Sequence, residues 1–206
     1  MKTLLILTGP QGSGNHLWSK IFALHPYVKG WSALLDEYWI GHDQEPWADC
    51  WLDPSRMKYK DTSQHNYFVT SVSVPYMNNG EAVVPKFKEF VKAAQTAGFI
   101  VKIAVLGRDK NIISYQEQRV RGAETYNQAL AAFQEFSLPT FLSYELLQLY
   151  GKRYLESISA QLQFPIALND PRLDKILEED TNKKYLKQSR PHKTDDLAKH
   201  ASRKHT

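Results

Sequence analysis

The residues whose types and spacing could do chemistry lie near the start of the chain, in the stretch "LLILTGPQGSGNHLW" from Leu4 to Trp18. Four residues separate Gly9 from Gly14, which is the spacing of the Walker A phosphate loop. In such a loop, backbone N–H groups at a helix N-terminus surround the anion. Asn15 and His16 stand where a nucleotide hydrolase carries Lys and Ser or Thr. The stretch therefore predicts an anion-binding loop that lacks the usual magnesium ligand.

A second candidate anion contact follows the apolar run 99–106, "FIVKIAVL", which is typical of a strand buried on both faces. Arg108 comes almost directly after this run, and Ser114 lies one or two turns into the next expected helix. Arginine can bind a phosphate through two charge-assisted hydrogen bonds, and a serine hydroxyl adds one donor. We expect a second phosphate here, and the alternative is an ion pair between Arg108 and Asp109 or another acid.

The elements that must position these residues alternate between strand-like and helix-like patterns, which predicts a parallel sheet covered by helices. Strands are expected at 4–8, 66–74, 99–106 and 140–145, and helices at 15–26, 81–98, twice within 111–136, and at 146–162. The predicted fold class is a single α/β domain over 1–190 with a central parallel sheet, followed by a basic tail over 191–206. Ligands of such sheets bind beyond the carboxyl ends of the strands, so the loop, Arg108 and Tyr144 could share one pocket.

The segment 31–65 interrupts this alternation with little periodicity and with four of the five tryptophans of the chain. A long irregular insertion in a compact domain is usually functional or mobile. The aromatic faces could bind a sugar or aromatic acceptor, or they could anchor the insertion to the core. The tryptophans concerned are Trp31, Trp39, Trp47 and Trp51.

Composition narrows the classes of protein further. The 206 residues are 42% hydrophobic and contain only one cysteine, Cys50, so an intramolecular disulfide is impossible and a cytoplasmic location is expected. No stretch approaches the roughly 20 apolar residues of a membrane helix.

The basic charge of the chain is concentrated near its end. Residues 183–206 hold eight of the 26 basic residues but two of the 22 acidic ones, so the net charge of +4 is a property of the tail. Neither nucleic-acid binding nor a metal site is predicted.

Three stretches resemble the sulfotransferase family that uses 3′-phosphoadenosine 5′-phosphosulfate (PAPS) as its donor. They are "GPQGSGNHL" at 9–17 with a helix ending in "LHP", "VKIAVLGRDKNIISY" at 101–115, and "FLSYELLQLYGKRYLESISAQLQFP" at 141–165. They occur in the order found in that family. The segment 167–186 also resembles the C-terminal run of the family, which ends in a basic loop over the donor.

The resemblance implies a binding site for PAPS and for its product, adenosine 3′,5′-bisphosphate, without a metal. The implied ligands of the 5′-phosphosulfate are Gln11, Gly12, Ser13, Gly14, Asn15, His16 and Leu17. The 3′-phosphate would contact Arg108 and Ser114, the adenine would lie near Tyr144, and the basic loop would contain Lys187, Arg190 and Lys193. Gly12 stands where the family usually has a lysine, so stabilisation of the leaving group is expected from His16, Asn15 or a cation of the tail.

The acceptor side requires a general base that takes a proton from the attacking hydroxyl. In the carbohydrate-directed branch of the family this base is a glutamate shortly after the "HP" that ends the first helix, and Glu37 occupies that place, beside Asp36. The alternative is an ordinary solvated acid. In the small-phenol branch the base is a histidine at a position where this chain has Ser73. Glu37 is therefore the predicted base.

Together these features predict a sulfotransferase that moves a sulfuryl group from PAPS to a hydroxyl or amine acceptor, either a small molecule or a carbohydrate. Two alternatives stay open. One is a P-loop kinase or NTPase in which Asp109 ends a Walker B strand, although the phosphate lysine and the magnesium hydroxyl are missing. The other is a nucleotide-binding module without catalysis, which the glycine at position 12 favours.

Overall fold

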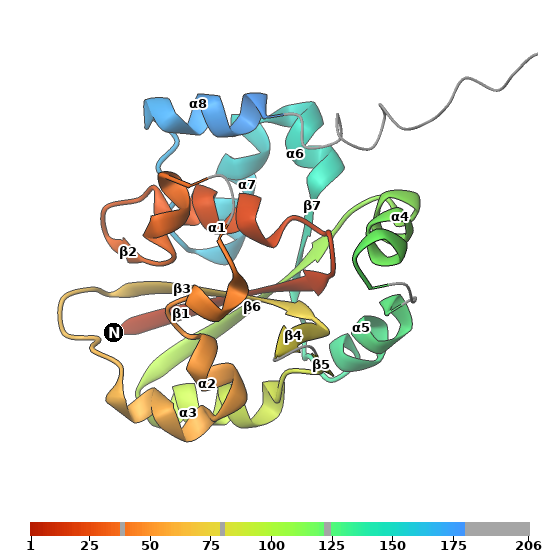
Figure 1. The fold of residues 1–206 in the computed structure, drawn as a ribbon. Helices are drawn as coiled ribbons and strands as arrows, with labels where there is room; N and C mark the ends of the chain where they lie inside the picture. Colours follow the sequence, from red (N-terminus) through yellow and green to blue (C-terminus); the bar gives the residue numbers. More distant parts are fainter. Residues whose placement is uncertain (38–39, 79–80, 122–124, 180–206) are drawn as a thin grey trace, which may run out of the picture.

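A computed structural model of the chain describes residues 1–37, 40–78, 81–121 and 125–179. Five parallel strands form the central sheet in the order β2-β3-β1-β6-β7, and helices cover both of its faces (Figure 1). The strands are β1 (Lys2–Pro10), β2 (Val28–Lys29), β3 (Tyr67–Val74), β6 (Phe99–Gly107) and β7 (Thr140–Ser143). The predicted α/β class with a central parallel sheet is confirmed.

Strand β1 occupies the middle of the sheet, with β3 on one side and β6 on the other. Its apolar side chains alternate between the two faces, as the period of two along a strand requires. Leu5 and Leu7 belong to one buried cluster, and Leu4 and Ile6 belong to the other. Because β1 is buried on both faces, the loop that follows it begins from a rigid support.

Helices on one face of the sheet pack with Leu5 and Leu7, and those on the other face pack with Leu4 and Ile6. The first group, above the sheet in Figure 1, consists of α1 (Asn15–Ala23), α6 (Tyr144–Tyr150), α7 (Lys152–Leu162) and α8 (Pro171–Glu178). The second group, below the sheet, consists of α2 (Ala48–Leu52), α3 (Phe87–Thr96) and α5 (Tyr126–Phe133). Helix α4 (Lys110–Arg121) follows β6 directly.

Two of the expected helices differ from the prediction. The helix expected at 81–98 begins only at Phe87, because Glu81–Val83 forms strand β5, which pairs with β4 (Tyr76–Asn78) in a separate hairpin. Pro85 disfavours the helical conformation of the residue before it, so the helix cannot extend back through this position. The helix expected at 146–162 is divided into α6 and α7 at Gly151, whose φ of 52° and ψ of −127° are not helical.

The irregular insertion contains short helical turns in its described part: η1 (Ser32–Leu35), η2 (His42–Gln44), α2 and η3 (Pro54–Tyr59). Trp47 and Trp51 are buried beneath the sheet, where Trp51 stacks on Phe90 of α3 with 3.7 Å between ring centroids. These two tryptophans therefore anchor the insertion to the core. Of the two roles that the sequence left open, anchoring or acceptor binding, they have the first.

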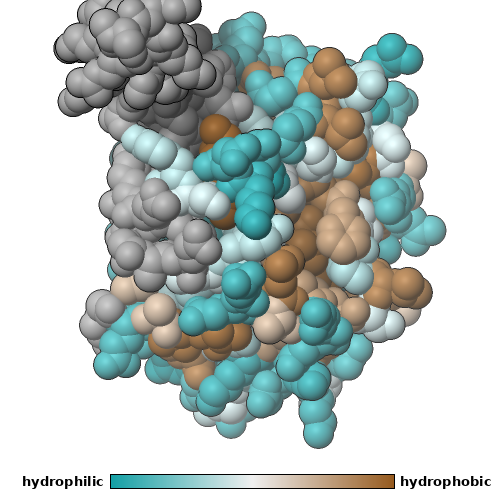
Figure 2. Space-filling view, turned by 90° about the vertical axis from the view of Figure 1, so that its right-hand side faces the viewer, coloured by the Kyte–Doolittle hydropathy of each residue, from teal (hydrophilic) through white to brown (hydrophobic). Residues whose placement is uncertain are grey.

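Apolar side chains remain exposed along β7, which is an edge strand, and along α6. Phe141, Leu146 and Leu149 are all exposed, and Figure 2 shows apolar residues between hydrophilic ones on the side of the molecule that carries these elements. None of the helices in the described part of the chain is both long and apolar enough to span a membrane.

Candidate functional site

The predicted anion loop joins the carboxyl end of β1 to α1, and its tight path depends on glycine. A Cβ atom on Gly9 would collide with Ser13 Oγ, and would lie 2.8 Å from the Leu106 carbonyl oxygen of the neighbouring strand. Gly12 and Gly14 have φ values of 88° and 106°, in the region that favours glycine. These three glycines hold the loop close against the end of the sheet.

The N-terminus of α1 leaves donors for a ligand. The Ser13 N–H closes the turn by donating to the Pro10 carbonyl at 3.0 Å, and the first helical bond is donated by Trp18 N to the Gly14 carbonyl. Between them, the N–H groups of Gly14, Asn15 and Leu17 have no backbone acceptor in the described part of the chain. They lie at the positive end of the helix dipole, which favours an anion.

A second feature of the loop points to a ligand. The indole of Trp18 is completely buried, and its Nε1–H has no hydrogen-bond partner among the described residues. A Cβ on Gly14 would lie 3.6 Å from Trp18 Cδ1, 3.9 Å from Nε1 and 4.0 Å from Tyr144 Cδ2. The N–H edge of Trp18 and the ring of Tyr144 thus border the space that Gly14 leaves beside the helix N-terminus.

Arg108 lies against the same loop. Its Nη1 donates to the Gly12 carbonyl at 2.9 Å, and its guanidinium carbon lies 4.2 Å from the centroid of the Tyr144 ring. Tyr144 is buried, so its ring forms a fixed platform beneath the cation. The structure brings Gly12, Gly14, Arg108 and Tyr144 together, as the sequence predicted, although the contact of Tyr144 with an adenine stays a prediction.

An open hollow of about 440 Å³ adjoins Arg108 between the ends of β6 and β7. Its lining combines apolar and polar side chains, among them Phe141, Leu146, Ser143 and Glu145. The Glu145 carboxylate accepts from the Asp109 N–H at 2.7 Å and from the Ser143 hydroxyl at 3.0 Å, so it ties α6 to the turn that carries Arg108. The hollow has the mixed apolar and polar lining that small-molecule sites commonly show.

Asp109 has a structural task in this turn. One oxygen of its carboxylate accepts from the N–H groups of Asn111 and Ile112, at 2.9 and 3.3 Å, and thereby caps α4. In the described ranges, His, Cys, Asp and Glu side chains form no group of three that could hold a metal ion. One oxygen of the carboxylate that the NTPase alternative needs for magnesium is thus engaged in a helix cap.

Asn15 turns its side chain inward. Its Oδ1 accepts from the Ser13 hydroxyl at 3.2 Å, and its Nδ2 donates to Ser71 Oγ of β3 at 3.1 Å. The backbone N–H of Ser71 donates in turn to Glu45 at 3.4 Å. Desolvation by burial raises the pKa of Glu45 to about 8. Asn15 can thus offer its backbone N–H to an anion, while its side chain connects the loop to β3.

The His16 ring lies in an aromatic group at the start of α1. It stacks on His42, with 4.8 Å between centroids and 14° between planes, and meets Trp31 edge to face at 5.1 Å. The Trp31 indole is buried, and its Nε1–H has no partner in the described part of the chain. This group brings the irregular insertion next to the loop, so Trp31 adjoins the candidate site.

The other predicted site residues are less closely connected. Glu37 is exposed after η1, and Ser114 is half-buried in α4, six residues from Arg108. Gln11 is half-buried in the loop. The basic residues Lys187, Arg190 and Lys193, the tail 191–206 and Trp39 lie outside the described residues.

Sequence reasoning missed Glu45, Ser71 and His42. One signal was available for Ser71, because Thr70, Ser71 and Ser73 place hydroxyl groups in an otherwise apolar strand, and all three are buried. Buried hydroxyls need partners, so their position beside β1 could have indicated a polar contact with the loop. Nothing in the local sequence indicates that Glu45 or His42 lies near the loop.

No protein-family model and no curated protein matches the chain. Among solved structures, it is similar to the tunicamycin resistance protein of Deinococcus radiodurans, with a TM-score of 0.50 and 14% identity over 81% of this chain and 99% of that one. It is also similar to the mouse sulfotransferase SULT7A1 complexed with PAP, with a TM-score of 0.46 and 12% identity over 85% of this chain and 63% of that one. At 14% identity the likeness to the first of these structures is one of fold alone.

Proposed function

We propose that the chain is a sulfotransferase that uses PAPS as donor and a hydroxyl or amine of a small molecule or carbohydrate as acceptor. The observation that carries the proposal is the convergence of the loop 9–17, Arg108 and Tyr144 at the carboxyl end of the sheet. The donor class also follows from the sequence resemblance of these same stretches to that family.

The residues present fit an anionic nucleotide. The N–H groups of Gly14, Asn15 and Leu17 and the buried Trp18 Nε1–H offer donors without a partner among the described residues, in a space that a side chain at position 14 would enter. Arg108 adds a positive charge between this space and the hollow beside β7. In our proposal the loop holds the 5′-phosphosulfate, Arg108 with Ser114 holds the 3′-phosphate, and the hollow receives part of the nucleoside.

The donor would supply an activated sulfuryl group, and the residues of the chain would bind, orient and move protons. Glu37 is the proposed base that accepts the proton of the acceptor hydroxyl as its oxygen attacks sulfur. His16 is proposed to donate a hydrogen bond to the leaving phosphate oxygen, where the related family usually has a lysine. In this proposal Arg190 and Lys193 belong to a basic loop that covers the bound donor.

Calorimetric titration with adenosine 3′,5′-bisphosphate in magnesium-free buffer tests the proposal directly. Binding at tens of micromolar or tighter is expected, and adenosine 5′-monophosphate should bind more weakly because it lacks the 3′-phosphate. Transfer is then tested with labelled PAPS against phenol, amine and carbohydrate acceptors. If the bisphosphate does not bind, the assignment is wrong.

The same titrations separate the alternatives. A P-loop kinase or NTPase predicts that ATP with magnesium binds more tightly than the bisphosphate, but the engagement of Asp109 in the α4 cap disfavours it. A nucleotide-binding module predicts bisphosphate binding with no transfer to any acceptor, and Gly12 in place of the lysine of the sulfotransferase family supports this alternative.

A further inference from the structure

A line of buried polar groups runs from the anion loop to the outer side of β3. Ser13 donates to Asn15, Asn15 donates to Ser71 Oγ, and the Ser71 N–H donates to Glu45 Oε1, over distances of 3.2, 3.1 and 3.4 Å. All four residues are at least nine-tenths buried. Buried polar groups connected in this way fix one another's positions, because each would be costly to leave without a partner.

The place of Glu45 follows from the sheet. Strand β2 pairs with Tyr67 and Phe68, and beyond these residues no strand of the described part of the chain lies along the outer edge of β3. The Glu45 carboxyl occupies this edge, where it accepts from the Ser71 N–H, while its other oxygen accepts from the Trp47 N–H at 2.8 Å. Glu45 thereby fixes the backbone of Ser71, whose hydroxyl accepts from the Asn15 side chain.

We propose that Glu45 is a positioning residue for the anion loop: its carboxyl holds Asn15 through Ser71, and a negative charge on it opposes anion binding. The inference rests on the proposed function, because it requires that the loop binds an anion. Glu45 lies behind β3 rather than in the loop, so it acts through Ser71 and does not contact the ligand.

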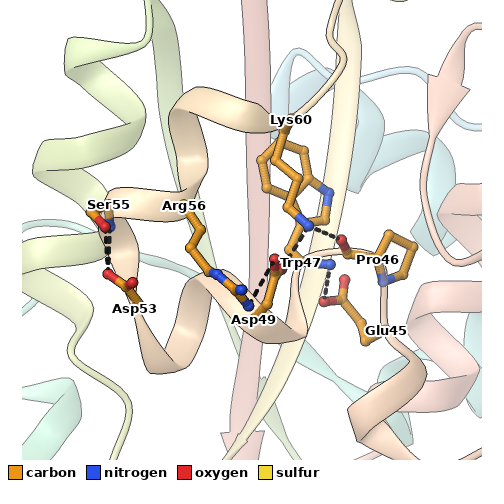
Figure 3. A network of polar contacts seen from close by, with 8 residues as sticks. All are labelled: Glu45, Pro46, Trp47, Asp49, Asp53, Ser55, Arg56 and Lys60. Atoms are coloured by element: carbon orange, nitrogen blue, oxygen red, sulfur yellow. Dashed lines mark hydrogen bonds and ion pairs between the residues drawn. The ribbon is translucent and has the colours of Figure 1, made fainter.

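The electrostatics around Glu45 support this inference. Burial raises the pKa of the carboxyl to about 8, although hydrogen bonds from Trp47, Thr70 and Ser71 and the charge of Lys60 oppose the shift. Lys60 does not provide a dedicated counter-ion, because its Nζ donates to the Pro46 carbonyl at 2.8 Å and to Asp49 at 2.6 Å (Figure 3). A negative charge on Glu45 would therefore be poorly compensated.

Other titratable groups near this line also have to be considered. On the side of α2, the Asp49 carboxylate is negative and the pKa of the Cys50 thiol is raised to about 12, so neither changes its charge between pH 7 and 9. On the side of the loop, His16 and His42 stack on one another, and Arg108 is the nearby basic residue. The pKa of Glu45, raised by burial to about 8, places its ionisation within the range that the experiments cover.

Binding and ionisation are then linked reciprocally. An anion in the loop disfavours a second negative charge nearby, so binding raises the pKa of Glu45, and ionisation of Glu45 lowers the affinity for the anion. The expected loss of affinity for adenosine 3′,5′-bisphosphate between pH 7 and pH 9.5 is roughly fivefold or more, the lower end of typical couplings between sites.

The first experiment measures the dissociation constant of the bisphosphate from pH 6.5 to 9.5 for the native protein, Glu45→Gln and Glu89→Gln. Glutamine keeps one acceptor oxygen, replaces the other with an NH₂ group that only donates, and cannot ionise. Its affinity at pH 7 should therefore be below native, while the further loss of affinity above pH 7.5 should disappear. Glu89 is an exposed carboxylate on α3, so its replacement is the matched control and should leave the native profile unchanged. Identical profiles for the native protein and Glu45→Gln would overturn the inference.

A second experiment needs only the native protein and so covers the case in which Glu45→Gln does not fold. Calorimetry in buffers of different ionisation enthalpy gives the number of protons taken up with the bisphosphate. Uptake with a maximum near pH 8 is expected, and uptake confined to the histidine range near pH 6.5 would contradict the role of Glu45. Absence of bisphosphate binding at every pH would instead count against the proposed function itself.

Discussion

At the scale of single residues, Arg108 carries most of the expected discrimination between nucleotides. Loss of a charge-assisted partner costs about 1.5–3 kcal/mol, so Arg108→Ala should weaken binding of adenosine 3′,5′-bisphosphate by roughly 10- to 150-fold. The control ligand is adenosine 5′-phosphosulfate, which has no 3′-phosphate and should lose much less affinity. Calorimetry with both ligands measures the difference.

The contacts of Arg108 also provide a way to interpret the opposite result. Because Arg108 Nη1 donates to the Gly12 carbonyl, its removal could act through the loop instead of through a 3′-phosphate. In that case both ligands would weaken equally. Arg108→Lys keeps the charge but loses the paired donors and the planar contact with Tyr144, so it should restore part of the charge-dependent affinity only.

Gly9 offers a test of how tightly the loop is packed against the sheet. Gly9→Ala would place its Cβ 2.8 Å from the Leu106 carbonyl oxygen, which belongs to the backbone of β6 and cannot move without disturbing the sheet. We expect a loss of about 1–3 kcal/mol in the free energy of unfolding, measured by chemical denaturation. Gly107→Ala is the control, because its Cβ would meet only an ordinary contact at 3.8 Å, and a change within about 0.5 kcal/mol is expected.

At the scale of elements, the cap of α4 distinguishes a structural aspartate from a magnesium ligand. Asp109→Ala removes the acceptor for two N–H groups and should destabilise the protein by about 1 kcal/mol. Asp109→Asn keeps an acceptor oxygen, so stability and bisphosphate affinity should stay close to native. A large loss of nucleotide affinity in Asp109→Asn, seen only with magnesium present, would instead favour the NTPase alternative.

The elements also show what the sequence could and could not predict. The strands β1, β3 and β6 and the helix α1 were predicted because their apolar periods are long and their ends are marked by glycine or proline. The division of the helix at Gly151 and the hairpin of β4 with β5 were missed, since each depends on a few residues whose local pattern also suits a helix.

For the site, the residues that neighbouring strand ends bring together were predicted, because the topology of a parallel sheet places those ends side by side. Gly12, Arg108 and Tyr144 are of this kind. Glu45 and His42 come from the irregular insertion. Its path depends on the tertiary packing of Trp47 and Trp51, and its sequence has no periodic pattern from which that path could be predicted.

At the scale of the whole molecule, the buried Glu45 makes stability depend on pH. Its pKa is about 8 in the folded chain, against an ordinary value of 4.5 for a glutamate side chain, so between these pH values the folded state binds one more proton than the unfolded chain. The contribution of Glu45 to the free energy of unfolding is therefore fully present below pH 4.5 and is lost as the pH rises through 8. Between pH 6 and pH 9 the free energy of unfolding should fall by about 3 kcal/mol.

Urea denaturation at pH 6, 7.5 and 9 measures this loss. Glu45→Gln has no ionisable group at this position, so its stability should vary much less with pH over the same range. An equal decline in both proteins would assign the pH dependence to other groups. No loss of stability of the native protein at pH 9 would show that the pKa of Glu45 is not raised in the folded chain.

The central position of β1 has a consequence for the nascent chain. β1 is synthesised before both of its partners, residues 67–74 and 99–107, so it lacks a neighbour on both edges for about 60 further residues and on one edge for about 100. At ~5–20 residues per second the second partner follows after roughly 5–20 s, and until then the apolar run "LLIL" is only partly covered. The strand that supports the anion loop in the finished protein is thus, during translation, an apolar segment open to contact with other chains.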